Sequence, residues 1–316
     1  MSDLTTRLGP LTLRNPVLLA SGTAGFGREL AEYLDLAGLG GIIVKGTSPS
    51  PWYGNPGPRT VETPSGLINS IGLENPGLRH FLEEDLPWLR TQGATVIVNV
   101  VGRTVEEYAA VAEGLAGADG VAALELNISC PNVKAGGIQF GHDPRLAAEV
   151  TRAVKAACGR PLFVKLSPNA PDVPAVAEAV LEAGADGLSL INTYLALAID
   201  VARLRPVLPS VFGGLSGPAI KPLALRWVWE AHARFRVPII GMGGIREWSD
   251  AAEFLLAGAQ AVAVGTASFT EPRTAAFVVE GLRKWLDERG FATVGEVVGL
   301  AHRAIDGEEA VPLGQS

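Results

Sequence analysis

The stretch Glu125-Leu-Asn-Ile-Ser-Cys-Pro-Asn-Val-Lys134 joins an apolar run to a polar loop. The run begins at Val121 and is typical of a short buried strand, whereas the residues after Ile128 are mostly polar. Cys130 therefore follows a buried strand, beside amide side chains and ahead of a glycine-rich segment. A thiol in such surroundings is a candidate proton-transfer group.

The rest of the chain repeats a short apolar run, a polar or glycine stop and a longer segment with helical spacing. The apolar runs are residues 17–20, 41–44, 96–100, 121–126, 162–166, 187–191, 237–241 and 261–264. The helical segments are residues 28–38, 76–92, 104–116, 144–158, 172–184, 219–235, 247–257 and 273–289. Strands that alternate with helices pair in parallel, so this pattern predicts an α/β fold, a (β/α)8 TIM barrel. No linker divides the chain, and we predict one domain over residues 1–316.

Four segments stand outside this repeat. Residues 4–13 alternate around a Gly-Pro pair, which predicts an N-terminal β-hairpin that closes the barrel bottom. The connections 46–75, 129–142 and 192–218 are longer than barrel loops usually are. Each follows a strand, so we expect these extended loops on the C-terminal face, where barrel enzymes carry their sites.

The composition argues against several classes of protein. A formal net charge of −7 over 316 residues disfavours a broad basic face for nucleic acid. The only cysteines, Cys130 and Cys158, provide neither a disulfide framework nor a CxxC metal site, and they favour a cytoplasmic setting. Residues 1–10 lack the apolar core of a signal peptide, and no apolar run approaches the ~18 residues that span a bilayer. We therefore expect no bound metal in this chain and no membrane contact.

Polar and glycine residues gather where the predicted strands end. In chain order they are Ser21, Gly22, Lys45, Gly46, Asn99, Asn127, Cys130, Lys165, Ile191-Asn192-Thr193, Gly243, Gly244, Gly265 and Thr266. Each has an ordinary structural explanation as well. The lysines could extend to solvent, the asparagines could satisfy loop backbone, and Cys130 could be an inert buried thiol. Cys158, at a predicted helix end, is best explained as an inert residue.

Two glycine-rich loops point to a phosphate group. Gly243 and Gly244 follow the seventh predicted strand, while Gly265 and Thr266 follow the eighth. Barrels often bind phosphate with these two loops, because glycines let backbone N–H groups approach the oxygens. There is no Walker A motif, and no GxGxxG follows the first strand. We therefore predict a phosphate-bearing cofactor in a barrel. The loop Asn69-Ser-Ile-Gly-Leu-Glu-Asn75 could hold a small polar ring.

These segments together resemble the class 1 dihydroorotate dehydrogenases. The matching motifs are Ser21-Gly-Thr, Lys45-Gly-Thr, Gly54-Asn-Pro, Asn69-Ser-Ile-Gly-Leu-Glu-Asn-Pro76, Glu125-Leu-Asn-Ile-Ser-Cys-Pro-Asn132, Val164-Lys-Leu-Ser-Pro-Asn169, Ile191-Asn-Thr193, Gly213-Gly-Leu-Ser-Gly-Pro-Ala219 and Gly241-Met-Gly-Gly244. The continuation Lys134-Ala-Gly-Gly-Ile-Gln-Phe-Gly141 is similar to class 1B catalytic subunits. The fumarate-using class 1A usually has Pro-Gly after Val133, and class 2 enzymes have serine at the position of Cys130.

The resemblance implies an enzyme that uses FMN to oxidise (S)-dihydroorotate to orotate in pyrimidine synthesis. It implies a partner subunit with FAD and a [2Fe–2S] cluster, which passes electrons to NAD+, and a heterotetramer built on a homodimer core. It assigns the general base to Cys130. By position, the residues that hold FMN would be Ser21, Lys45, Gly46, Asn99, Asn127, Lys165, Ile191, Gly217, Gly243, Gly244, Gly265 and Thr266. The substrate residues would be Lys45, Asn69, Ser70, Ile71, Gly72, Leu73, Asn127, Asn192 and Thr193.

Some features depart from the family, and other functions compete with this one. Leu67, Ser70, Ala135 and Ala196 stand where the family often has other residues, but these positions affect loop packing. One alternative is the same oxidation with fumarate as acceptor and no partner. Another is a dihydropyrimidine dehydrogenase activity, since that family has a similar cysteine loop. The third is a non-flavin phosphate-binding barrel in which Lys165 forms a Schiff base.

Overall fold

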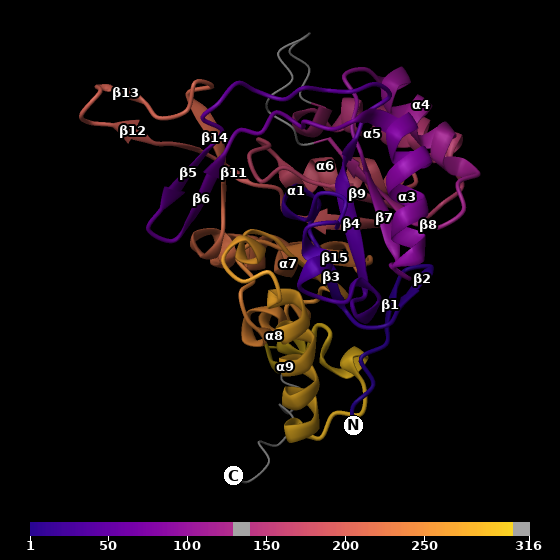
Figure 1. Ribbon diagram of the computed structural model, residues 1–316. Helices are drawn as coiled ribbons and strands as arrows, with labels where there is room; N and C mark the ends of the chain where they lie inside the picture. The colour runs from indigo at the N-terminus through magenta and orange to yellow at the C-terminus, as the bar shows by residue number, and fades with distance from the viewer. Residues whose placement is uncertain (129–139, 306–316) are drawn as a thin grey trace.

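A closed barrel of parallel strands is the centre of the molecule (Figure 1). The computed structural model describes residues 1–128 and 140–305. The barrel order is β10 (Gly187–Leu190), β15 (Ile239–Met242), β16 (Ala261–Val264), β3 (Val17–Leu19), β4 (Gly41–Thr47), β7 (Val96–Val100), β8 (Val121–Asn127) and β9 (Leu162–Lys165), which pairs again with β10. These strands coincide with the predicted apolar runs. The prediction of a TIM barrel is confirmed.

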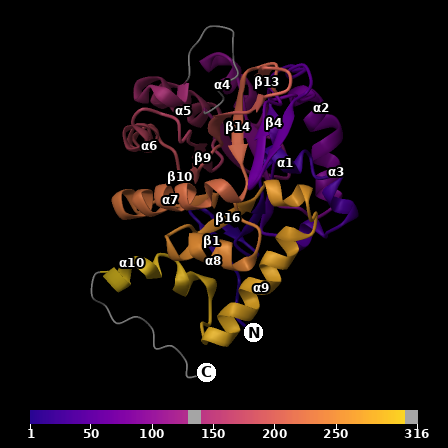
Figure 2. The ribbon, with the colours of Figure 1, turned by 90° about the vertical axis from the view of Figure 1, so that its left-hand side faces the viewer.

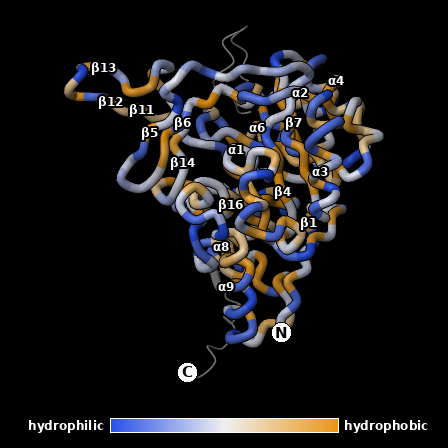
Figure 3. Tube along the Cα trace, viewed as in Figure 1, coloured by the Kyte–Doolittle hydropathy of each residue, from blue (hydrophilic) through white to orange (hydrophobic). Residues whose placement is uncertain are grey.

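The strands are apolar on both faces, because both faces are covered. Every second residue, such as Leu124 and Leu126 in β8, packs outward under the helices. The alternate residues, such as Ile97 and Phe163, fill the barrel interior. In Figure 3 much of the chain around β4 and β7, in the middle of the molecule, has the colour of hydrophobic residues. This double burial explains why the strands read as continuous apolar runs rather than as alternating ones.

The N-terminal hairpin closes one end of the barrel, as predicted. It consists of β1 (Thr6–Leu8) and β2 (Leu11–Leu13), with Leu8 paired to Leu11. Leu8 and Leu13 are fully buried and belong to the same interior cluster as Phe163. The hairpin therefore seals the bottom of the barrel with apolar side chains and leaves the opposite end for polar residues.

Helices surround the strands. They are α1 (Ser21–Ala24), α2 (Gly77–His80), α3 (Leu86–Thr91), α4 (Val105–Ala116), α5 (Pro144–Ala157), α6 (Val173–Glu182), α7 (Lys221–Phe235), α8 (Trp248–Leu256), α9 (Thr274–Arg289) and α10 (Leu300–Ile305). In Figure 2, α9 and α10 lie near the lower end of the molecule, and α8 contacts both. A π-helical turn, Phe81–Asp85, joins α2 to α3 within the predicted segment 76–92.

The predicted helix over residues 28–38 is wrong. Two short 3-10 turns, Leu30–Glu32 and Leu36–Gly38, replace it. The side chain of Asp35 accepts a hydrogen bond from the backbone N–H of Ala37, which starts a second turn instead of continuing the first. Aspartate competes with the backbone in this way and favours helix starts over helix interiors. The sequence also missed α10, which follows the last predicted helix.

Two of the long connections form a second sheet, which the sequence did not predict. Its antiparallel order is β11 (Tyr194–Leu197), β14 (Phe212–Ser216), β6 (Gly66–Asn69) and β5 (Thr60–Thr63). The small pair β12 (Ile199–Asp200) and β13 (Arg205–Pro206) projects from it at the upper left of Figure 1. The strands β6 and β14 come from different connections, so only the tertiary fold brings them together. Periodicity within one connection carries no sign of such pairing.

Candidate active site

Polar side chains line the barrel mouth opposite the hairpin. On β8 the inward positions run from Ala123 through Glu125 to Asn127, because side chains alternate along a strand. The neighbouring strands supply Asn99 from β7 and Lys165 from β9, which pair in register with Glu125 and Asn127 respectively. Asn99, Asn127 and Lys165 are at most 6% exposed. The barrel interior thus changes from apolar to polar within one strand length.

A hydrogen-bonded chain connects these side chains. The Nδ2 of Asn99 donates to Oε2 of Glu125 at 2.6 Å, and the Nζ of Lys165 lies 3.6 Å from the same oxygen. The Nδ2 of Asn127 donates in turn to Oδ1 of Asn99 at 3.3 Å. The hydroxyl of Tyr108 donates to the backbone carbonyl of Asn127 at 2.8 Å. Sequence reasoning missed Glu125, although its inward register beside Asn127 was the available signal.

A cavity of about 660 Å³ opens above this layer. It brings together every residue expected to hold FMN and nearly all of those expected to hold substrate: Ser21, Lys45, Gly46, Asn69, Ile71, Gly72, Leu73, Asn99, Asn127, Lys165, Ile191, Asn192, Thr193, Gly217, Gly243, Gly244, Gly265 and Thr266 line it. The exception is Ser70, which is 2% exposed and does not line the cavity. Its hydroxyl instead accepts a hydrogen bond from Nδ2 of Asn55 at 2.8 Å, so its contribution is to loop packing.

The two glycine-rich loops meet at one end of the cavity. Gly243 has φ +131° and Gly244 has φ +81°, a region that favours glycine. A Cβ atom at Gly244 would lie 2.8 Å from Cβ of Lys221 in α7, so the loop also needs glycine to pack against that helix. Across the cavity end, the hydroxyl of Thr266 donates to the hydroxyl of Ser216 in β14 at 2.8 Å. The second sheet therefore helps to hold the loop after β16.

The 69–75 loop forms another side of the cavity. Asn69 ends β6, and its Nδ2 donates to the carbonyl of Gly214 in β14 at 3.2 Å. Gly72 and Leu73 both have positive φ, +79° and +54°, so the backbone turns sharply here. The carbonyl of Ile71 accepts a hydrogen bond from the N–H of Asn55 at 3.0 Å. These contacts give the loop a defined shape that presents Ile71, Gly72 and Leu73 to the cavity.

Lys45 has unusual electrostatics. It lies two residues after Ile43 on β4 and lines the cavity. Burial lowers the pKa of its ammonium below the ordinary value of 10.5. The carboxylate of Glu74 opposes this shift, and the guanidinium of Arg59, which is ion-paired with Glu74, adds to it. Lys45 therefore loses its proton more readily than a surface lysine does.

This shift predicts how stability depends on pH. Between the lowered pKa of Lys45 and its unfolded value of 10.5, the unfolded chain holds the proton and the folded chain does not. Raising the pH through that window therefore favours the folded state, by about 1.4 kcal/mol for each unit of the shift. Denaturant unfolding of the ligand-free protein across this window measures the rise. We expect Lys45→Met to remove it, and matching pH profiles for the two proteins would contradict the prediction.

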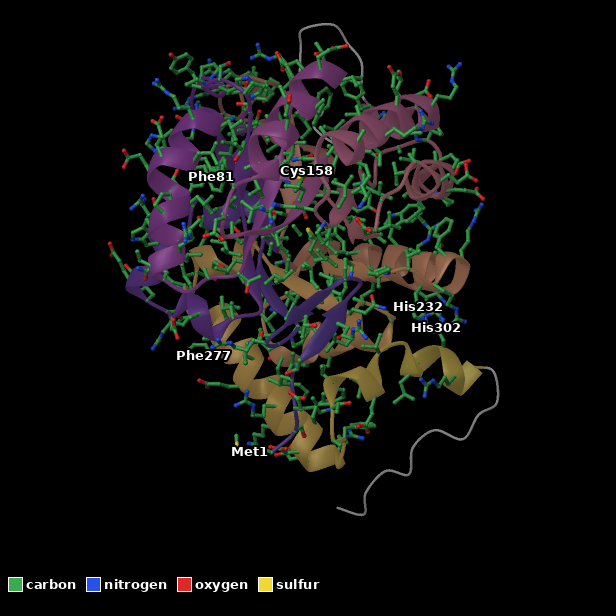
Figure 4. The ribbon with its side chains drawn as sticks, turned by 90° about the vertical axis from the view of Figure 1, so that its right-hand side faces the viewer. Met1, Phe81, Cys158, His232, Phe277 and His302 are labelled. Carbon is green, nitrogen blue, oxygen red and sulfur yellow. The ribbon has the colours of Figure 1, made fainter. Side chains whose placement is uncertain are left out.

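Of the two cysteines, the structure describes Cys158 and not Cys130. Cys158 is 2% exposed at the end of α5, inside the molecule in Figure 4, as expected of an inert residue. Cys130 lies outside the described residues, as do residues 134–139 of the segment that is similar to class 1B catalytic subunits. The residues on either side of the undescribed stretch are joined, since the N–H of Gly141 donates to the carbonyl of Ile128 at 2.9 Å.

Within residues 1–128 and 140–305, no cluster of three or more His, Cys, Asp or Glu side chains could hold a metal ion. Over the same residues, no helix is both long and apolar enough to cross a bilayer.

Comparison with known proteins identifies the family. Residues 3–286 match the sequence model of the family described as dihydroorotate dehydrogenase. The chain belongs to the dihydroorotate dehydrogenase family. The resemblance seen in the sequence is thus confirmed for almost the whole chain.

Individual dihydroorotate dehydrogenases are similar to this chain in sequence and in fold. The chain is 54% identical over 300 residues to the "dihydroorotate dehydrogenase B (NAD(+)), catalytic subunit" of Desulforamulus reducens, covering 95% of this chain and 99% of that protein. The protein of the same name from Geobacillus kaustophilus is 51% identical, covering 95% of this chain and 96% of its own. A crystal structure of DHODH from Eimeria tenella, in complex with ferulenol, superposes with a TM-score of 0.79 at 25% identity, covering 95% of this chain and 89% of that one.

Proposed function

We propose that the chain is the catalytic subunit of an NAD+-linked dihydroorotate dehydrogenase, which oxidises dihydroorotate to orotate in pyrimidine synthesis. The observation that carries the proposal is that one cavity gathers lysine, asparagine and glycine residues from nearly every strand end. The names of the relatives, which are 51–54% identical over about 95% of the chain, support the choice of substrate and of NAD+.

The family is flavin-dependent, and we propose FMN as the flavin held in this chain. The cavity of about 660 Å³ is of the size that cofactor sites have. At Gly265 the cavity lining leaves open space, because a Cβ atom on this residue would come no closer than 3.7 Å to any neighbour. The loops of Gly243, Gly244 and Thr266 would hold the phosphate through backbone N–H groups. Lys165 and the paired asparagines Asn99 and Asn127 would hold the ring system.

The remaining lining residues suit a small pyrimidine acid. Asparagine side chains offer both donors and an acceptor, so Asn69, Asn127 and Asn192 would bind the edges of such a ring. The Lys45 ammonium would pair with the carboxylate. Bound FMN supplies a hydride acceptor. The proton on the neighbouring ring carbon goes to a base of this chain, for which we propose the thiolate of Cys130.

Further proposals concern the assembly. The name "catalytic subunit" of the relatives implies a partner chain. We propose that the partner carries FAD and a [2Fe–2S] cluster, that two of each chain form a heterotetramer around a homodimer core, and that the assembly is cytoplasmic. We propose also that residues 1–316 form one FMN-binding domain, with no role in nucleic-acid binding.

Purification with and without a partner tests the function. The chain is purified alone and together with the iron–sulfur flavoprotein of the same organism, and dihydroorotate-dependent reduction of NAD+ is measured. We expect a yellow protein in both cases and reduction of NAD+ only with the partner. A colourless protein would contradict the flavin. Rapid turnover of the isolated chain with fumarate, or oxidation of dihydrouracil in preference to dihydroorotate, would favour the corresponding alternative.

A further inference from the structure

Glu125 is a buried carboxylate that the proposed reaction does not use. Its side chain is 0% exposed and does not line the cavity. On β8 it lies between Ala123, which belongs to the apolar interior, and Asn127, which belongs to the cavity wall. An apolar residue would fill such a position at lower cost, because burying a carboxylate costs several kcal/mol before it is compensated.

The compensation of this charge is incomplete. Oε2 accepts the hydrogen bond from Asn99 and lies 3.6 Å from the ammonium of Lys165. Oε1 accepts no hydrogen bond from any residue that the structure describes, although it is fully buried. A buried polar atom without a partner calls for an explanation other than stability. Asn99 and Lys165, which Glu125 contacts, are both residues of the cavity wall.

The chemistry of a carboxylate determines how these two neighbours lie. An ionised carboxylate only accepts hydrogen bonds, so Asn99 must turn its NH2 group toward Glu125 and its oxygen toward Asn127. The observed bonds run in that direction, from Asn127 to Asn99 and from Asn99 to Glu125. The carboxylate also lies 3.6 Å from the Lys165 ammonium at the base of the cavity, where that lysine is only 6% exposed.

We propose that Glu125 is a positioning residue that holds the Lys165 ammonium and the Asn99 amide in place for the flavin. The inference rests on the proposed FMN site. Without the carboxylate, the buried Lys165 side chain loses the acceptor 3.6 Å away that fixes its position beside the apolar layer. The cavity then loses a donor that is held in place at this point.

A double-mutant cycle on FMN affinity tests the proposal. FMN is titrated into the apoprotein of the wild type, Glu125→Gln, Lys165→Met and the double variant, and the dissociation constant is read from flavin fluorescence. In the wild-type background we expect Glu125→Gln to raise the FMN dissociation constant by about tenfold or more. In the Lys165→Met background it should change the affinity less than about twofold, because no ammonium remains to be held and the glutamine carbonyl can still accept the hydrogen bond from Asn99. A carboxylate that merely supports the fold would give the same factor in both backgrounds, which would overturn the proposal.

A second buried carboxylate provides the matched control. Asp85 is 3% exposed, pairs with Arg28 at 3.1 Å and has an Oδ2 without a hydrogen-bond partner among the described residues, but it lies outside the cavity wall. Asp85→Asn should therefore leave the FMN dissociation constant unchanged, whereas a loss equal to that of Glu125→Gln would overturn the assignment. Glu125→Asp keeps the charge and should retain more FMN affinity than Glu125→Gln, which provides a test if the glutamine variant folds poorly.

These measurements use no dihydroorotate. A wild type that binds FMN but does not oxidise dihydroorotate would contradict the proposed reaction and leave the role of Glu125 standing. A wild type that binds no FMN would overturn both proposals.

Discussion

Replacing Cys130 by serine is expected to slow dihydroorotate oxidation about 10²–10⁴-fold at neutral pH, while FMN stays bound. A thiolate takes a proton at a pH where a hydroxyl remains protonated, so serine keeps the size of the side chain and loses the base. The loss should appear in kcat and in the rate of flavin reduction measured by stopped flow. The absorption spectrum and the FMN content should match those of the wild type.

The other cysteine provides the control for this experiment. Cys158 is buried at the end of α5 and does not line the cavity. Cys158→Ser should therefore oxidise dihydroorotate at close to the wild-type rate. Near-wild-type turnover of Cys130→Ser, or equal losses in the two variants, would refute the assignment of the base.

Replacing Lys165 by methionine is expected to reduce both stability and FMN binding. The variant leaves Glu125 as a fully buried carboxylate that has lost its counter-charge, and breaking a buried pair in this way costs about 3–5 kcal/mol. The loss of the charge-assisted contact should weaken FMN binding by about 10- to 100-fold. Denaturant unfolding and the FMN titration measure the two effects.

Two comparisons make this prediction specific. Adding Glu125→Gln to Lys165→Met should restore most of the lost stability, because no unpaired charge remains in the barrel. Lys155→Met removes another ion-paired lysine, 2.5 Å from Asp186 and outside the cavity wall, and should not change FMN binding. A Lys165→Met protein that stays yellow through dialysis would argue against contact between Lys165 and FMN.

Local patterns in the sequence were enough to predict the barrel. Short apolar runs such as 96–100 and 162–166 alternate with helical segments, and strands buried on both faces cannot be mistaken for surface elements. The polar residues at the strand ends, Lys45, Asn99 and Lys165 among them, could also be assigned to one cavity. This follows because the carboxyl ends of parallel strands in a barrel all point to one side.

Elements that depend on contacts distant in sequence were not predictable. The sheet of β5, β6, β11 and β14 joins two connections more than a hundred residues apart, and each of these strands alone is too short to show a pattern. The segment 28–38 has helical spacing, but the local hydrogen bond of Asp35 divides it. Ser70 lies within a stretch that resembles the family, and the fold nevertheless turns it away from the cavity toward Asn55.

By itself, the sequence determined the barrel, its family and the residue types at its mouth, because these depend on periodicity and on motifs that are contiguous in the chain. Only the tertiary structure decided which of those side chains touch. The pairing of Glu125 with Asn99 and Lys165 comes from the register of three neighbouring strands, and register is set by packing of the whole barrel rather than by any one segment. The partners of this buried charge lie on neighbouring strands, so its role can be inferred only from the folded barrel.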